Sequence, residues 1–157
     1  MKEKNPLVTA FLEDHKQLTQ GFSSLLRALR EGDIAKASQI ANDIDRLAGP
    51  HIEFEEEFFY PIVEQARGRE YVSRLYKEHG AGLHAVKFLR DAKSGLEADE
   101  TEALLAEAQT ALDHAVSCGT LLSYVTALGD QQQADLLQKL LGLRNQGRRW
   151  TELAEKA

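Results

Sequence analysis

The sequence predicts an all-α protein, an antiparallel up-down four-helix bundle with a short additional C-terminal helix. Apolar residues recur at three- and four-residue steps along four long segments, which is the period of one α-helix face. Short connections join these segments, so consecutive helices should fold back on one another. The length of 157 residues suits a single domain. We expect residues 1–157 to form one domain, with the bundle over about 5–128 and a C-terminal helix and tail over about 130–157.

The first helix is predicted over about residues 6–31, because Asn5-Pro6 is a suitable cap and first-turn pair. The second is predicted over about 33–68. Pro50 and Pro61 should kink or interrupt it, since each lacks a backbone N–H donor and clashes with the preceding turn.

The third and fourth stripes run over about residues 72–95 and 99–129, and each ends at a glycine. Residues 131–143 are typical of a shorter fifth helix. The tail over 144–157 is more polar, and it either packs against the bundle or docks on a partner.

Charge and cysteine content exclude several classes of function. The chain has 19 Lys and Arg against 25 Asp and Glu, a net charge of −6, which gives no electrostatic reason to bind nucleic acid or an anionic membrane. No apolar run reaches a membrane span, and the first residues lack the apolar core of a signal peptide. The single cysteine, Cys118, excludes an intrachain disulfide and fits a reducing compartment. We therefore expect a cytoplasmic protein with no nucleic-acid or membrane partner.

Four of the five histidines lie on the apolar stripes of four different predicted helices: His15, His51, His79 and His114. One histidine on an apolar stripe is more often a hydrogen-bonded core residue than a ligand. Four histidines on four stripes would converge in the centre of a bundle, and this coincidence favours a shared metal site.

Glu55 follows His51 by four residues, so both side chains project from the same helix face. A buried carboxylate is costly unless it is paired, and a cation in the core would offset that cost. Imidazole and carboxylate together suit iron, manganese or zinc. The neighbouring Glu53, Glu56 and Glu57 are predicted to form a solvated face, with Glu56 at its border and placed to orient a ligand.

The chain also contains an internal repeat. The dipeptides Asp14-His15 and Glu78-His79 each introduce a similar stripe. The next stripe histidine follows 36 residues after His15 and 35 residues after His79. Two helix pairs of similar layout should therefore face each other across a pseudo-two-fold axis.

The segment His51-Ile52-Glu53-Phe54-Glu55-Glu56-Glu57-Phe58-Phe59-Tyr60-Pro61 resembles the H-x-x-x-E-E motif, followed by aromatic or aliphatic residues and Pro, of the hemerythrin-like, or HHE cation-binding, bundles. Asp14-His15 and Glu78-His79 resemble the histidines of that family's first and third helices, and the resemblance covers about residues 5–128.

The resemblance implies non-heme iron, as one ion or as a diiron pair bridged by carboxylates, with zinc or manganese as other candidate metals. It implies that His15 and His51 bind one metal, that His79 and His114 bind the other, and that Glu55 bridges them. Members of the family bind oxygen, sense oxygen, iron or nitric oxide, or handle iron.

The second half of the chain departs from the family pattern. Aligning His114 with His51 places Cys118 opposite Glu55, so the second bridging carboxylate is missing. Cys118 is an inert core residue, a thiolate ligand, or a redox-sensitive thiol whose pKa an adjacent metal lowers. His84 follows His79 by five residues, about 140° around an α-helix, and joins the site only if a π-bulge resets the register. We predict that His84 lies outside the site and that the two metal positions are unequal, which argues against reversible dioxygen carriage.

Three functions follow from these residues. The first is a non-heme iron protein that binds or senses a small ligand (dioxygen, nitric oxide or peroxide) or handles iron. The second is a non-heme iron oxidase or peroxidase with Tyr60, Tyr76 or Tyr124 near the metal, although no residue fixes a substrate. The third is a partly metal-free helical interaction module in which residues 130–157 recruit a protein partner.

Overall fold

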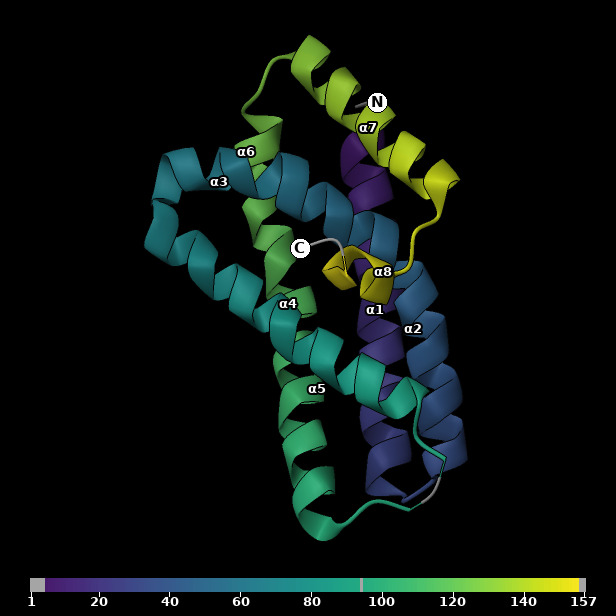
Figure 1. Ribbon diagram of the computed structural model, residues 1–157. Helices are drawn as coiled ribbons and strands as arrows, with labels where there is room; N and C mark the ends of the chain where they lie inside the picture. Colours follow the sequence, from purple (N-terminus) through teal and green to yellow (C-terminus); the bar gives the residue numbers. More distant parts are fainter. Residues whose placement is uncertain (1–4, 94, 156–157) are drawn as a thin grey trace.

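The computed structural model describes residues 5–93 and 95–155, and over this part of the chain it contains helices and no strand (Figure 1). The prediction of an all-α fold is confirmed. Within the described residues, no helix is both long enough and apolar enough to cross a membrane. The elements are α1 (Pro6–Arg30), α2 (Ile34–Phe54), η1 (Glu55–Phe59), α3 (Tyr60–Arg67), α4 (Arg69–Arg90), α5 (Ala98–Cys118), η2 (Gly119–Leu121), α6 (Leu122–Thr126), α7 (Asp130–Gln146) and α8 (Trp150–Glu155).

Four long helices form the body of the molecule. Helix α1 packs against α2 and α5, and α4 packs against the same two helices, so the four close into a ring. In Figure 1, α1 and α4 run downwards while α2 and α5 run upwards. These helices correspond to the four apolar stripes, although the boundaries differ from the predicted ones at two places.

The predicted second helix is interrupted by a π-helical turn, η1, in which the Tyr60 N–H donates to the Glu55 carbonyl five residues earlier. Pro61 has no backbone N–H to continue the hydrogen-bond ladder of an α-helix. It lies in the first turn of α3, where a backbone donor is not needed. Pro50 lies inside α2, which runs on to Phe54.

The predicted fourth helix is also shorter than expected. Helix α5 ends at Cys118 and a 3-10 turn, η2, leads into the short α6. The fifth helix, α7, is longer than predicted because it begins at Asp130 and continues to Gln146, where Gly147 ends it in a left-handed conformation.

The core consists of two apolar clusters separated by a polar layer. One cluster lies toward the α4–α5 connection and includes Phe22, Leu25 and Leu89, whereas the other lies toward α7 and includes Phe11, Phe59 and Leu140. The four stripe histidines and Glu55 are buried between them. Because each apolar cluster closes off one side of this layer, its polar groups must satisfy one another or bind a ligand.

The C-terminal tail packs against the bundle, as in the first of the two alternatives that the sequence left open. Helix α8 lies against α2 and α4. The buried Asp45 carboxylate accepts hydrogen bonds from the backbone N–H and hydroxyl of Thr151 and from the guanidinium of Arg90. Trp150 is inserted between Phe22 and Gly82, and a Cβ at Gly82 would lie 2.9 Å from the indole ring.

Replacing Gly49 with Ala should destabilise the protein by about 1–3 kcal/mol, because the new Cβ would lie 1.8 Å from the Arg148 carbonyl oxygen and would displace the C-terminal segment. Gly142→Ala is the matched control, since Gly142 is also helical and has open space around its Cβ position. The control should gain up to about 1 kcal/mol from helix propensity. Thermal unfolding of both variants measures the difference, and an unchanged Gly49→Ala protein would contradict the packing described here.

Candidate metal centre

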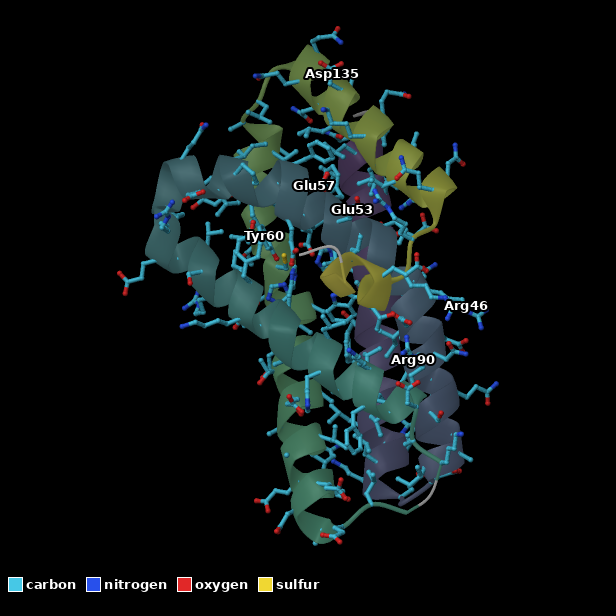
Figure 2. All side chains as sticks on the ribbon, viewed as in Figure 1. Arg46, Glu53, Glu57, Tyr60, Arg90 and Asp135 are labelled. Carbon is cyan, nitrogen blue, oxygen red and sulfur yellow. The ribbon has the colours of Figure 1, made fainter. Side chains whose placement is uncertain are left out.

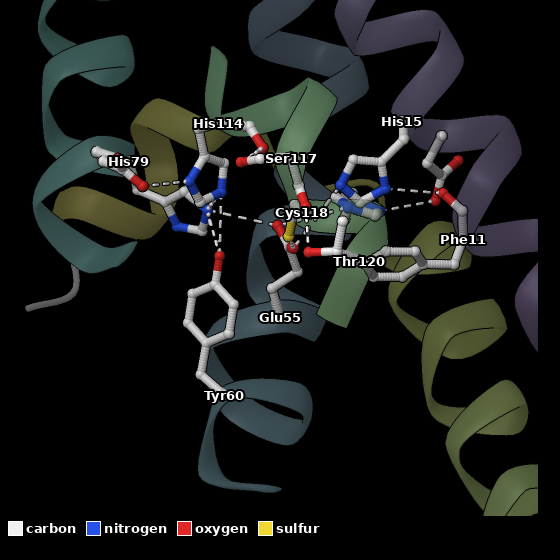
Figure 3. A network of polar contacts seen from close by, with 12 residues as sticks. Phe11, His15, Glu55, Tyr60, His79, His114, Ser117, Cys118 and Thr120 are labelled. Atoms are coloured by element: carbon white, nitrogen blue, oxygen red, sulfur yellow. Dashed lines mark hydrogen bonds and ion pairs between the residues drawn. The ribbon is translucent and has the colours of Figure 1, made fainter. Parts of the chain in front are cut away.

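The imidazoles of four helices converge on the Glu55 carboxylate (Figure 3). The Nε2 atoms of His51 and His79 both lie 3.4 Å from Glu55 Oε1, and Nε2 of His15 lies 4.0 Å from Oε2. The His114 Nε2 lies 3.1 Å from that of His79. Each ring therefore turns the same nitrogen toward one point, and Glu55 lies between the two pairs.

The opposite nitrogen of each ring, Nδ1, is fixed by an oxygen atom. These oxygens are supplied by the Phe11 carbonyl for His15 (3.1 Å), Asp14 for His51 (3.1 Å), Glu56 for His79 (2.8 Å) and Glu78 for His114 (2.9 Å). An acceptor at Nδ1 holds the proton on that atom and leaves a lone pair on Nε2. When neutral, the four rings are thus oriented to bind a cation through Nε2, and His51 and His79 must release a proton to do so.

The charges within the layer compensate one another when no cation is bound. Burial opposes ionisation of Glu55, but the facing imidazoles of His51 and His79 hold the pKa of this carboxyl well below its ordinary value. Burial also opposes charging of His51 and His79, yet Glu55 and the outer carboxylates raise the pKa of each ring to about 9. Burial and the neighbouring imidazole lower the pKa of His15 to about 4.

Glu55 is shared by two groups of ligand atoms. His15, Glu55 and Cys118 form one group, and Glu55, His79 and His114 form the other; within each, the ligand atoms lie within 4.8 Å of one another. The thiol of Cys118 donates to Glu55 Oε2 at 2.9 Å, and burial raises the pKa of this thiol. The repeat placed Cys118 in the second half of the chain, at the position that matches Glu55, whereas the structure groups it with His15 of the first half.

Tyr60 enters the site although its position was not predicted as a ligand. Its hydroxyl lies 2.9 Å from Nε2 of His79 and 3.2 Å from Nε2 of His114, and the side chain is fully buried. Figure 2 shows the contrast with Arg46 and Asp135, which are exposed on the outer surface. Tyr60 follows Glu55 by five residues, and only the π-helical turn brings residues at that spacing onto one face.

The structure tests the sequence predictions for three further residues, His84, Glu53 and Glu57. His84 is on the surface, where its Nδ1 contacts Glu107, and it does not reach the centre. The prediction of a solvated face was wrong for Glu53, which is buried and paired with Arg148 from the C-terminal segment. The tail, whose position the sequence did not fix, supplies this partner; Glu57 is exposed as expected.

The donor set fits a metal ion. His51 Nε2 is buried and, among the described residues, has no hydrogen-bond partner although it faces the centre. The Tyr60 oxygen lies 2.9 and 3.2 Å from Nε2 of His79 and His114. Glu55 Oε1 lies 3.4 Å from Nε2 of both His51 and His79. Adjacent ligands about 2.1 Å from one ion would be separated by roughly the same distances, about 3.0 Å in an octahedral and 3.4 Å in a tetrahedral shell.

Comparison with protein-family models gives a match to the hemerythrin HHE cation-binding domain over residues 7–116. The chain belongs to this family. No curated protein and no solved structure matches it. The match covers His15, His51, Glu55, Tyr60, His79 and His114, whereas Cys118 and helices α6, α7 and α8 lie beyond it.

A small cavity adjoins the centre of this hemerythrin domain. It has about 20 Å³ open to a water-sized molecule, and His15, Glu55, His79 and His114 border it. The rest of its wall is mostly apolar and includes Leu18, Phe22, Ala48, Ile52, Ala111 and Trp150. Trp150 comes from α8, so the C-terminal extension forms part of the ligand-side wall.

Replacing Glu56 with Ala should weaken metal binding by about 10–100-fold, because His79 loses the carboxylate that orients its ring and raises its basicity. Glu57→Ala is the control, since the adjacent Glu57 is exposed on the same turn. Competitive titration with a metal chelator gives both dissociation constants. Equal affinities in the two variants would show that the Glu56 contact does not support the centre.

The metal-free protein should lose stability as the pH rises from about 6.5 to 9. The folded protein raises the pKa of His51 and of His79 to about 9, against 6.5 for an ordinary histidine, so their protonation stabilises the fold fully below pH 6.5 and that stabilisation is lost as the pH passes 9. A metal ion competes with these protons. The melting temperature of the zinc-loaded protein should therefore rise relative to that of the metal-free protein as the pH increases from about 6.5 to 9. Melting temperatures of both forms test this, and parallel curves would contradict it.

Proposed function

We propose that this protein is a non-heme iron protein that holds one or two iron ions in the bundle and binds or senses a small ligand such as dioxygen or nitric oxide. One observation carries the proposal: four Nε2 atoms surround the buried Glu55 carboxylate while an outer oxygen atom holds the Nδ1 of every ring. Structural histidines in an ordinary core have no reason to share this orientation.

The chemistry of the donors and the family resemblance together favour iron. Imidazole nitrogen and carboxylate oxygen suit iron, manganese and zinc, and iron is the one of these that the resemblance to the hemerythrin-like bundles implies. The layer also carries the buried negative charge of Glu55, which a divalent or trivalent ion neutralises. Bound iron would supply the open coordination position and the redox chemistry that the side chains lack.

The cavity restricts the ligand to a small one. A space of about 20 Å³ has room for a molecule about the size of water, which favours a small ligand. Its mostly apolar wall suits a weakly polar gas molecule. These features favour binding or sensing over turnover of a larger substrate, and they support the first of the functions considered from the sequence.

The C-terminal segment gives less support to an interaction module. The apolar residues Leu136, Leu140, Leu143 and Trp150 are buried against the bundle. An apolar stripe that already packs within the chain is not free to recruit a partner, and the retained donor set indicates that the metal is the reason for the buried histidines.

Replacing His51 with Ala should release iron and lower the melting temperature of the iron-loaded protein, since metal that binds only the folded state adds stability. Glu55→Ala should have the same effect because Glu55 contacts both histidine pairs. The control is His84→Ala, which removes an exposed histidine from outside the centre. Metal analysis and thermal unfolding of the three variants, each loaded with ferrous iron without oxygen, give the comparison.

Small-ligand binding is tested on the same ferrous protein by adding nitric oxide without oxygen and recording the visible spectrum and its electron paramagnetic resonance. A ferrous nitrosyl signal in the wild type that is absent from His51→Ala would support the proposal. If His51→Ala and Glu55→Ala keep the wild-type iron content, the metal site is misplaced. If iron binds but nitric oxide leaves the spectra unchanged, small-ligand binding is excluded.

A further inference from the structure

The contacts of Tyr60 are unusual for a hydrogen-bonded core tyrosine. Its oxygen and the Nε2 atoms of His79 and His114 form a triangle with sides of 2.9, 3.2 and 3.1 Å. All three atoms are buried, and Glu55 Oε1 lies 3.4 Å from the His79 corner. The triangle therefore forms one face of a compact cluster of four donor atoms.

With both rings neutral, the protons available do not satisfy this triangle. The Nδ1 protons of His79 and His114 are directed to Glu56 and Glu78, so each neutral ring presents a lone pair to the centre. The hydroxyl of Tyr60 has one proton and can donate it to only one of the two rings. A second proton on His79 lets that ring donate to Tyr60 or Glu55, whereas one cation in contact with all three atoms takes up all three lone pairs at once and replaces these protons.

We propose that Tyr60 is a metal ligand, and that its phenolate oxygen completes the position formed by His79, His114 and Glu55. This inference rests on the proposed iron-binding function and identifies the composition of one of its two positions. On binding, the Tyr60 O–H bond breaks, the proton leaves to solvent, and the oxygen lone pair forms the bond to iron. Phenolate and carboxylate are hard anionic donors, so this position should favour the ferric ion.

The two positions then differ in kind and not only in occupancy. One has His79 and His114 with the oxygens of Tyr60 and Glu55, whereas the other has His15 with Glu55 and the sulfur of Cys118. His51 contacts the shared Glu55 at 3.4 Å. The π-helical turn makes this difference, because it turns Tyr60 back onto the face that carries Glu55.

A ferric phenolate is recognised by a visible charge-transfer band and by ring vibrations in the resonance Raman spectrum excited within that band. The full chain is loaded with ferrous iron without oxygen, dioxygen is then added as the oxidant to give ferric iron, and the spectra are recorded. The wild type should show both signals. Tyr60→Phe should lose both while its remaining imidazole and carboxylate ligands keep iron bound, with a weaker affinity.

Two control variants separate Tyr60 from other sources of colour. Cys118→Ser removes the sulfur whose thiolate would also absorb in the visible, and it should keep the tyrosine ring vibrations. Tyr124→Phe removes a tyrosine that contacts Arg67 outside the centre, and its spectra should match the wild type. A band that survives in Tyr60→Phe and disappears in Cys118→Ser would overturn the inference and identify the sulfur as the ligand.

A measurement on the wild type avoids any dependence on the folding of Tyr60→Phe. Protein grown with ring-deuterated tyrosine should show shifted Raman bands if tyrosine binds the ferric ion. Unshifted bands, or iron bound without any ring vibration, would overturn the inference and leave the iron-binding function in place. A wild-type chain that takes up no iron would instead refute the proposed function itself.

Discussion

The structure depends on a single buried carboxylate. Glu55 is almost fully excluded from solvent and stays ionised, because His51 and His79 both face its Oε1 atom. A carboxylate in an apolar core costs several kcal/mol if it is unpaired. The helix positions of the histidines, the acids behind them and the π-helical turn all compensate for or orient this one group.

The hydrogen bonds to the Nδ1 atoms of the histidines explain why the internal repeat pairs an acid with each histidine. In each half, the acid that precedes a stripe histidine does not serve that histidine but the one on the next stripe: Asp14 holds His51, and Glu78 holds His114. One dipeptide thus provides a ligand and an orienting acid that act on neighbouring helices. The pairing ties α1 to α2 and α4 to α5 at the level of the centre, which links formation of the bundle to formation of the site.

The sequence predicted the parts of the site that follow ideal helix geometry. Periodicity was sufficient to place His15, His51, His79 and His114 in the interior and to add Glu55 at four residues from His51. The same geometry failed where the helix is not ideal, because a five-residue spacing points away from an α-helix face. That rule placed His84 outside the site but also concealed Tyr60.

The sequence does contain a local signal for the π-helical turn, which is Pro61, but α-helical periodicity alone does not include it. Pro61 cannot donate to the carbonyl of residue 57, so the ladder must be rearranged just before it, and this rearrangement follows directly after the His51-to-Glu55 step. The burial of Glu53 had no such signal. Its partner Arg148 lies 95 residues later, in a segment whose position depends on tertiary packing alone.

Residues beyond the family match contact the candidate metal centre and help to position its side chains. Arg144 of α7 donates to Asp14 at 2.8 Å, and Asp14 in turn contacts Nδ1 of His51, so the extension reaches a ligand through one carboxylate. Trp150 closes the cavity on the other side, against His79 and Phe22. Both contacts depend on where the extension crosses α2, and the close approach of Arg148 at Gly49 fixes that crossing. The orientation of His51 and one wall of the cavity are therefore set by the same segment, which couples the packing of the C-terminal extension to the candidate metal centre.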